Sequence, residues 1–135
     1  MKLTSVSLLV FSVFLMGCSD AREGMGTVTG TITLDGSPLP DAAVEFTSEQ
    51  GGRASYGRTD SDGYYELMAT RTAKGAAVGA HKVRITTEDV IDDNGEERVV
   101  PETVPAKYNT QTELTENVGA GSNTINFELI SGANG

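Results

Sequence analysis

The feature that most constrains the fold of this chain is a repeated alternation of apolar and polar side chains, interrupted by turn-forming residues. Between residues 27 and 34, Val28, Ile32 and Leu34 alternate with threonines. Side chains two residues apart share one face of a β-strand, so this pattern predicts a strand with one buried face. Gly30 interrupts the apolar face and indicates a bulge or a close approach of another backbone. Similar runs recur at residues 42–47, 54–59, 64–68, 81–86, 114–118 and 125–129.

Turn signals separate these runs. Residues that favour tight turns lie at Asp35-Gly36, from Asp60 to Gly63, and around Gly119. Seven short strands without a convincing helix predict an all-β, seven-stranded antiparallel β-sandwich or barrel. Residues 70–78 are predicted to form a loop, with a brief helical turn at 73–77. Residues 89–105 are predicted to form a long, exposed, acidic loop in which residues 98–100 are extended.

The amino-terminal residues carry a targeting signal. Lys2 precedes an apolar run at residues 3–17, and Cys18, the single cysteine, follows at once. At about 15 residues the run is shorter than the roughly 20 that span a bilayer, so it resembles a signal peptide rather than a membrane span. The segment Leu15-Met16-Gly17-Cys18 resembles a bacterial lipobox. That resemblance implies that residues 1–17 are removed and that Cys18 is lipidated.

This interpretation divides the chain into a signal peptide at 1–17, a lipidated cysteine and tether at 18–26, and a folded domain at 27–131. It places the protein in the cell envelope, anchored to a membrane through Cys18. Ser19, in place of the acidic residue typical of inner-membrane retention, favours the outer membrane or its periplasmic face. An ordinary cleaved secretion signal and an uncleaved anchor are the alternatives.

The charge balance excludes some partners. The chain has 19 acidic and 10 basic residues, which gives a net charge of −9. A negative field of this size opposes binding to nucleic acid or to anionic lipid surfaces. The basic residues are scattered among acidic ones, so no nucleic-acid partner is predicted.

Several segments resemble the carboxypeptidase regulatory-like domain family. They lie at residues 28–32 (VTGTI), 36–39 (GSPL), 42–46 (AAVEF), 59–67 (TDSDGYYEL), 79–85 (GAHKVRI) and 121–129 (GSNTINFEL). The resemblance implies a transthyretin-like (prealbumin-type) Greek-key sandwich, similar to small planctomycete envelope lipoproteins. Such domains are mostly accessory or binding modules, so the resemblance indicates the fold more strongly than the function.

Two acidic segments are candidate metal sites. Asp60 and Asp62, and likewise Asp92 and Asp93, precede a glycine as in fragments of calcium-binding loops. Neither segment has the glutamate that an EF-hand loop carries at its twelfth position. Turn formation is therefore the preferred interpretation, with a weak surface calcium site as the alternative. No cofactor is predicted.

Catalytic chemistry finds little support in the residue types present. His81 is the only histidine, and it falls on the apolar face of its predicted strand. We therefore expect a buried structural histidine rather than a general base, and no catalytic residue is predicted. Usual zinc-ligand sets are also lacking.

Two non-enzymatic function hypotheses remain, beside a third in which the chain is an enzyme that depends on His81. The first is a non-enzymatic interaction or structural module that binds another envelope protein through the acidic loop at 89–105 or through an edge strand. The second is a carbohydrate-binding module of the cell surface. Tyr56, Tyr64 and Tyr108 suggest the second, because exposed aromatic rings can contact sugars or proteins.

Overall fold

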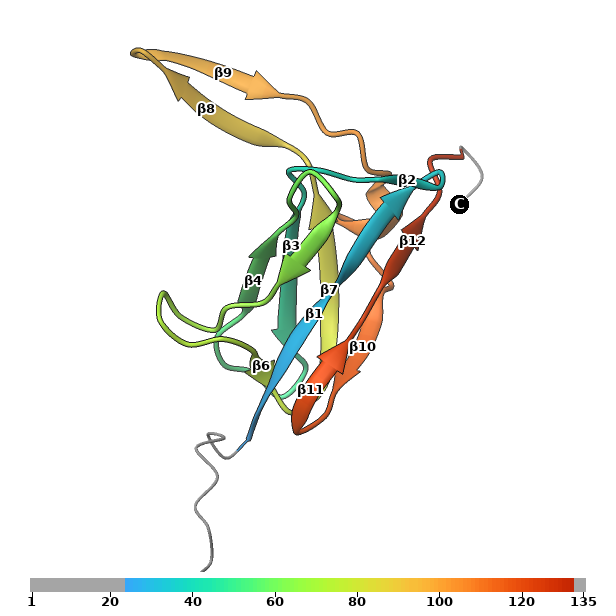
Figure 1. Cartoon of the computed structure of the whole chain (residues 1–135). Helices are drawn as coiled ribbons and strands as arrows, with labels where there is room; N and C mark the ends of the chain where they lie inside the picture. The colour runs from blue at the N-terminus through green and yellow to red at the C-terminus, as the bar shows by residue number, and fades with distance from the viewer. Residues whose placement is uncertain (1–23, 133–135) are drawn as a thin grey trace, which may run out of the picture.

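The computed structural model describes residues 24–132. In this part of the chain, strands are joined by turns, one short 3₁₀ turn is present (η1, Ala106–Tyr108), and there is no α-helix (Figure 1). The all-β prediction is thereby confirmed. The strands are β1 (Met25–Leu34), β2 (Ser37–Pro38), β3 (Ala43–Ser48), β4 (Ser55–Arg58), β5 (Tyr64–Glu66), β6 (Ala76–Ala77), β7 (Gly79–Thr86), β8 (Asp89–Asp93), β9 (Glu96–Val100), β10 (Thr115–Val118), β11 (Gly121–Thr124) and β12 (Phe127–Leu129).

The long strand β1 organises the larger of two main sheets. Along one edge it pairs antiparallel with β2, β5 and β6, and along the other it pairs in parallel with β11 and β12. The second main sheet has four strands in the order β10-β7-β3-β4, all antiparallel. Strands β8 and β9 form a separate two-stranded sheet.

The two main sheets contribute to one hydrophobic core. Tyr65 and Leu67 are buried as the alternation predicts, together with Phe46 and Phe127. The Phe46 ring lies 6.2 Å from the Phe127 ring in an edge-on arrangement, and the Tyr65 ring lies 6.3 Å from Phe127. Since Phe46 belongs to one sheet and Phe127 to the other, these aromatic contacts join the sheets.

Gly30 lies where another backbone approaches β1 closely, as predicted. A Cβ atom at this position would lie 1.9 Å from the carbonyl oxygen of Ile125. Strand β11 ends at Thr124 and β12 begins at Phe127, so Ile125 and Asn126 bridge the two parallel segments. Asn126 Oδ1 accepts a hydrogen bond from the backbone N–H of Thr31 at 2.9 Å and so replaces a missing ladder bond.

Several local predictions require correction. The expected purely antiparallel arrangement is wrong for β1, which runs parallel to β11 and β12. The expected final strand at 125–129 begins only at Phe127, and β11 was not predicted. Residues 73–77 form no helical turn, because Gly75 has a φ of +104° and the next two residues pair with β1. The described residues thus contain twelve strands where seven were expected.

The segment at 89–105 is also not the loop that its composition suggested. Its first twelve residues form the β8–β9 hairpin, paired from Asp89 with Val100 to Asp93 with Glu96. Only the following residues, up to η1, lack strand structure. The expected extended conformation of residues 98–100 is confirmed, as part of β9.

Candidate functional site

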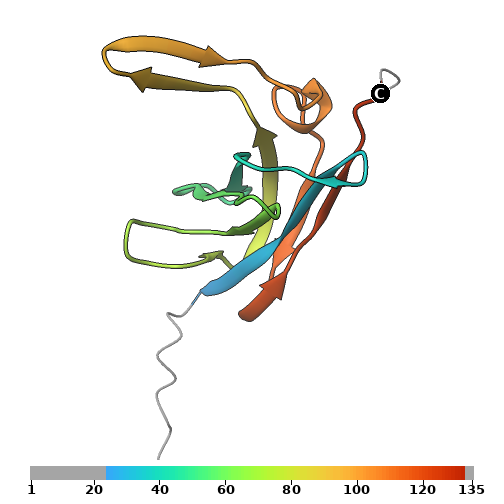
Figure 2. The ribbon, with the colours of Figure 1, turned by 45° about the horizontal axis from the view of Figure 1, so that its top comes forward.

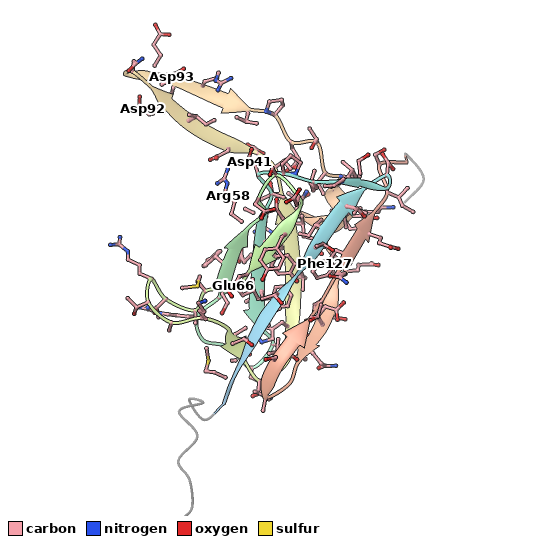
Figure 3. The ribbon with its side chains drawn as sticks, viewed as in Figure 1. Asp41, Arg58, Glu66, Asp92, Asp93 and Phe127 are labelled. Atoms are coloured by element: carbon pink, nitrogen blue, oxygen red, sulfur yellow. The ribbon has the colours of Figure 1, made fainter. Side chains whose placement is uncertain are left out.

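The β8–β9 hairpin extends away from the two main sheets (Figures 1 and 2). Its strands pair with each other and with no other described strand. Every residue from 90 to 99 is exposed, so the hairpin contributes almost nothing to the core. Figure 3 shows Asp92 and Asp93 at its far end, distant from Phe127 in the core.

A two-residue turn closes the hairpin. Asn94 and Gly95 have φ values of +57° and +86°, the pattern of a type I′ turn. Asp92 Oδ1 accepts a hydrogen bond from the backbone N–H of Gly95 at 2.8 Å. The turn fixes the register, so the faces of the hairpin can be assigned from the pairing.

One face of the hairpin combines exposed apolar and acidic side chains. Val90 is directly opposite Val99, and the two are 58% and 63% exposed. Beyond them, Asp92 is opposite Glu97. The same pairing of like charges recurs on the other face at the tip, where Asp93 is opposite Glu96.

These pairs make the isolated hairpin a weak structure. Like charges directly opposite each other destabilise a two-stranded sheet. A two-stranded hairpin without further packing is at best marginally stable in water. The arrangement therefore costs stability, and no buried contact of residues 90–99 offsets that cost.

Glu102 holds the base of the hairpin together. Its carboxylate accepts hydrogen bonds from the backbone N–H groups of Thr87, at 2.8 Å, and Val104, at 3.0 Å. It also accepts from the hydroxyl groups of Thr86 and Thr87. Burial raises the pKa of Glu102, but these hydrogen bonds outweigh it and lower the pKa from 4.5 to about 2. A charged Glu102 thus ties the chain entering β8 to the chain leaving β9.

An ion pair attaches β8 to the main body. Arg58 of β4 donates a hydrogen bond from Nη2 to Asp89 Oδ2 at 2.6 Å. This bond lowers the pKa of the Asp89 carboxyl. Both side chains are exposed, so salt screens their attraction and the stabilisation is modest.

We expect Glu102→Gln to lower the free energy of unfolding by about 1–2 kcal/mol at pH 7, because hydrogen bonds to a charged acceptor are lost. The native pKa lies below the unfolded value of 4.5, so the stabilisation is complete above that pH. It is lost as pH falls from about 4.5 towards 2. Urea unfolding of both proteins at pH 7, 4 and 3 measures this difference.

Glu113→Gln is the matched control for this measurement. Glu113 is exposed, and no hydrogen bond of its carboxylate is found among the described residues. Its substitution should leave the stability within about 0.5 kcal/mol of the original, as is usual for surface positions. A difference between the original protein and Glu102→Gln that stays constant from pH 7 to 3 would contradict the role given to the carboxylate.

Asp60 and Asp62 lie in a turn, which is the preferred interpretation of their segment. Asp60 Oδ1 accepts hydrogen bonds from the backbone N–H groups of Asp62, at 2.9 Å, and Tyr64, at 3.0 Å. Gly63 has a φ of +76°, a conformation that glycine adopts without strain. The Asp60 carboxylate therefore stabilises the turn between β4 and β5.

Asp92 and Asp93 lie on the hairpin, about one residue before its turn. Among residues 24–132, no three His, Cys, Asp or Glu side chains are grouped closely enough to hold a metal ion. The structure thus brings neither pair of candidate aspartates into a ligand cluster. The calcium alternative stays a prediction without a described ligand set.

His81 is buried on the core side of β7, with 1% of its surface exposed. Its Nε2 lies 2.6 Å from the carbonyl oxygen of Ala77, and its ring is 5.8 Å from the ring of Phe46. The expected burial of His81 is confirmed. A substrate in solvent has no access to this imidazole.

The three candidate tyrosines lie in different surroundings. Tyr56 on β4 and Tyr64 on β5 are 55% and 45% exposed. Tyr108 in η1 packs against the core, and its hydroxyl oxygen accepts a hydrogen bond from the backbone N–H of Ile130. Tyr56 lines a pocket together with Met68 and the loop that follows it.

The proposed lipidation site, Cys18, lies outside the described residues, as do the signal peptide and most of the tether. Within residues 24–132, the structure contains no helix with the length and hydrophobicity of a membrane span.

Sequence reasoning missed the hairpin although a signal was present. Asn-Gly between two runs that contain β-branched residues is a strong indication of a hairpin, and Asn94-Gly95 has Ile91 before it and Val99 after it. Glu102 had no comparable signal, because its hydrogen-bond partners are known only once the two ends of the hairpin are brought together.

The fold and the site define a small all-β domain that presents an acidic hairpin on its surface. The chain belongs to the family described as "Domain of unknown function (DUF6795)", whose sequence profile matches residues 28–120. This range contains the whole hairpin and ends before β11.

Other comparisons add little. No curated protein matches the chain. Among solved structures, a 9R-lipoxygenase from Cyanothece PCC8801 is similar over 76% of this chain, with 15% sequence identity and a TM-score of 0.39. The chain spans 17% of the length of that lipoxygenase.

Proposed function

We propose that this protein is a non-enzymatic interaction module of a bacterial cell envelope, and that the β8–β9 hairpin binds a basic partner protein. The observation that carries the proposal is the exposed Val90–Val99 pair next to opposed acidic side chains. A domain that only had to be stable would gain from burying these valines and separating these charges. A partner that covers the valines and neutralises the acids would remove both costs at once.

The hairpin offers two kinds of contact to such a partner. The outer edges of β8 and β9 are unpaired among the described strands, so their backbone groups are open to strand addition. Val90 and Val99 supply exposed apolar surface, which is the kind of surface found at the buried centre of protein interfaces. Both contacts lie on one element that protrudes from the body, where a partner can reach it.

Charge argues for a basic protein rather than a second copy of this chain. Asp92, Asp93, Glu96 and Glu97 gather at the tip, and the whole chain carries a net charge of −9. Two such tips repel each other, and charged residues on exposed edges are a known means of preventing self-association. A partner with a positive surface is instead attracted and oriented.

We expect the double substitution Glu96→Lys and Glu97→Lys to weaken partner recovery about tenfold, equivalent to 1.4 kcal/mol. The new lysines face Asp93 and Asp92, so the cross-strand pairs become attractive and the hairpin becomes more stable. Lost binding could therefore not be attributed to a disordered hairpin. The measurement is co-isolation from native envelope, with amide exchange of residues 89–100 as a check on hairpin order.

Glu113→Lys with Glu128→Lys is the matched control, because it makes the same change in charge at exposed positions outside the hairpin. Recovery with this control should equal that of the original protein. Equal losses with both double variants would show a dependence on net charge alone, and undiminished recovery with the hairpin variant would contradict the proposal.

We further propose that the domain is a transthyretin-like β-sandwich anchored through a lipidated Cys18, in the outer membrane or on its periplasmic face. The two sheets around one core and the resemblance of the strand segments support the fold. The lipobox-like sequence supports the anchor. A short tether would hold the body close to the membrane and leave the hairpin for proteins of the same compartment.

A further inference from the structure

We infer that a shallow pocket beside β4 binds an acidic saccharide, one that bears carboxylate or sulfate groups. The pocket has a volume of about 630 Å³ and lies between β4 and the loop that connects β5 to β6. This volume is within the range of small-ligand sites. Tyr56, Met68, Arg53 and Arg71 supply its principal side chains. The inference concerns a surface separate from the hairpin and does not depend on the function proposed above.

A short backbone bridge joins two of the residues that line the pocket. The N–H of Tyr56 donates to the carbonyl oxygen of Met68 at 3.0 Å, and the N–H of Met68 donates to that of Tyr56 at 2.8 Å. These two hydrogen bonds fix the two residues side by side at the edge of the four-stranded sheet. The Tyr56 side chain remains 55% exposed, so much of its surface is open to a ligand.

Internal hydrogen bonds also order the wall of the pocket. Thr70 Oγ1 accepts hydrogen bonds from the backbone N–H groups of Thr72, at 3.3 Å, and Ala73, at 3.0 Å. The N–H of Ala69 donates to the carbonyl oxygen of Ala73 at 2.8 Å. Figure 2 shows this loop projecting from the body. A loop tied in this way presents a formed site, which reduces the entropy cost of binding.

The charge of the pocket is opposite to that of the molecule. Arg53 and Arg71 line it and make no ion pair within residues 24–132, and no acidic residue lines it. By contrast, Arg58 and Arg84 are paired with acidic side chains. Two uncompensated guanidinium groups in a chain of net charge −9 indicate an anionic ligand.

The side chains select the class of anion. The planar guanidinium group binds carboxylate and sulfate through two parallel hydrogen bonds. The Tyr56 ring and the Met68 side chain offer apolar surface for the face of a sugar ring. Thr70 and Thr72 also line the pocket, and threonine hydroxyl groups can form hydrogen bonds with sugar hydroxyls. A saccharide with acidic groups uses all of these features.

Calorimetric titration of the full protein with an oligogalacturonate tests the assignment, with a maltooligosaccharide of equal length as the neutral probe. We expect binding of the acidic saccharide only. The double variant Arg53→Gln with Arg71→Gln should weaken it at least tenfold. Lys82→Gln with Lys107→Gln removes the same charge from positions outside the pocket and the hairpin, so it should leave binding within twofold.

A sulfated oligosaccharide and adenosine monophosphate complete the set of probes. A second supporting outcome is binding of the sulfated oligosaccharide in place of the oligogalacturonate. If the double variant Arg53→Gln with Arg71→Gln weakens its binding by the same factor, that result supports the site equally well. No binding of either acidic saccharide, or equal losses in both double variants, would overturn the inference. Tighter binding of adenosine monophosphate than of both saccharides would also overturn it, because the pocket would then favour a nucleotide.

Discussion

Substituting alanine for Gly30 is expected to lower the free energy of unfolding by about 3 kcal/mol, near the upper end of typical overpacking effects. The new Cβ atom would lie 1.9 Å from the carbonyl oxygen of Ile125 and 2.7 Å from its carbonyl carbon. Both are backbone atoms and cannot swing aside as a flexible side chain would. Relief of the clash requires β1 to separate from the segment that joins β11 to β12.

That separation would break two hydrogen bonds of Ile125. The N–H of Ile125 donates to the carbonyl oxygen of Thr29 at 2.8 Å, and the carbonyl oxygen of Ile125 accepts from the Tyr65 hydroxyl at 2.6 Å. Tyr65 is 1% exposed, so its hydroxyl would lose its partner in a buried environment. A buried hydroxyl without a hydrogen bond costs about 1–3 kcal/mol.

Gly119→Ala is the matched control for Gly30→Ala. A Cβ atom on Gly119 would meet only Asn123 Oδ1, at 3.5 Å, and the φ of Gly119 is not in the left-handed region. We expect its unfolding free energy to stay within about 0.5 kcal/mol of the original. Urea denaturation followed by circular dichroism compares the three proteins, and equal stabilities for the two variants would refute the close-approach explanation.

Gly30 also shows what the sequence reveals well. The alternation of residues 27–34 locates β1 and its buried face, and a glycine on that face signals a close neighbour without identifying it. The same pattern correctly places Val44, Phe46, Val83 and Ile85 in the core. Periodicity of two reports which side chains face inwards, because that depends only on the geometry of a single strand.

Strand direction and pairing are less visible in the sequence. Nothing in residues 121–129 distinguishes a parallel from an antiparallel neighbour, since either arrangement buries Phe127 and Leu129 on the same face. The parallel pairing of β12 with β1 joins residues about a hundred positions apart. This pairing depends on the path that the chain takes between β1 and β12, and local sequence patterns do not encode that path.

The hairpin was missed for a different reason. Composition dominated the interpretation of residues 89–105, because acidic residues and prolines are typical of loops. Strand propensity in Val90, Ile91, Val99 and Val100 and the turn at Asn94-Gly95 pointed to a hairpin. An exposed hairpin buries neither face, so its sequence lacks the apolar alternation on which the other strands were recognised.

The candidate pocket was beyond sequence reasoning. Arg53 and Arg71 are eighteen positions apart, and in the sequence they look like two of several scattered basic residues. The bridge between Tyr56 and Met68 brings their segments together, and it is a tertiary contact outside any regular strand pair. Exposed tyrosines suggested sugar binding, but only the structure separates Tyr56 from the packed Tyr108.

Cys18→Ser is expected to move the protein from the membrane fraction to the soluble fraction almost completely. Each buried CH₂ of an acyl chain contributes about 0.8 kcal/mol to membrane binding, and two chains anchor a protein stably. The hairpin and the acidic body would offer no substitute, since a chain of net charge −9 is repelled by anionic lipid surfaces. Fractionation with and without detergent measures the membrane association. The intact mass of the mature protein shows whether residues 1–17 are removed and Cys18 is modified.

Ser19→Ala is the matched control, because it changes a residue beside the cleavage point and keeps the Cys18 thiol. The Ser19→Ala protein should stay in the membrane fraction. The Cys18→Ser protein should keep the same thermal unfolding midpoint as the detergent-solubilised original, because residue 18 precedes the first strand at Met25. An original protein whose mass starts at Met1, or one that carries an unmodified Cys18, would refute the anchor. Such a result would leave the hairpin and pocket proposals intact, since both depend on residues of the folded domain and neither depends on the way it reaches the envelope.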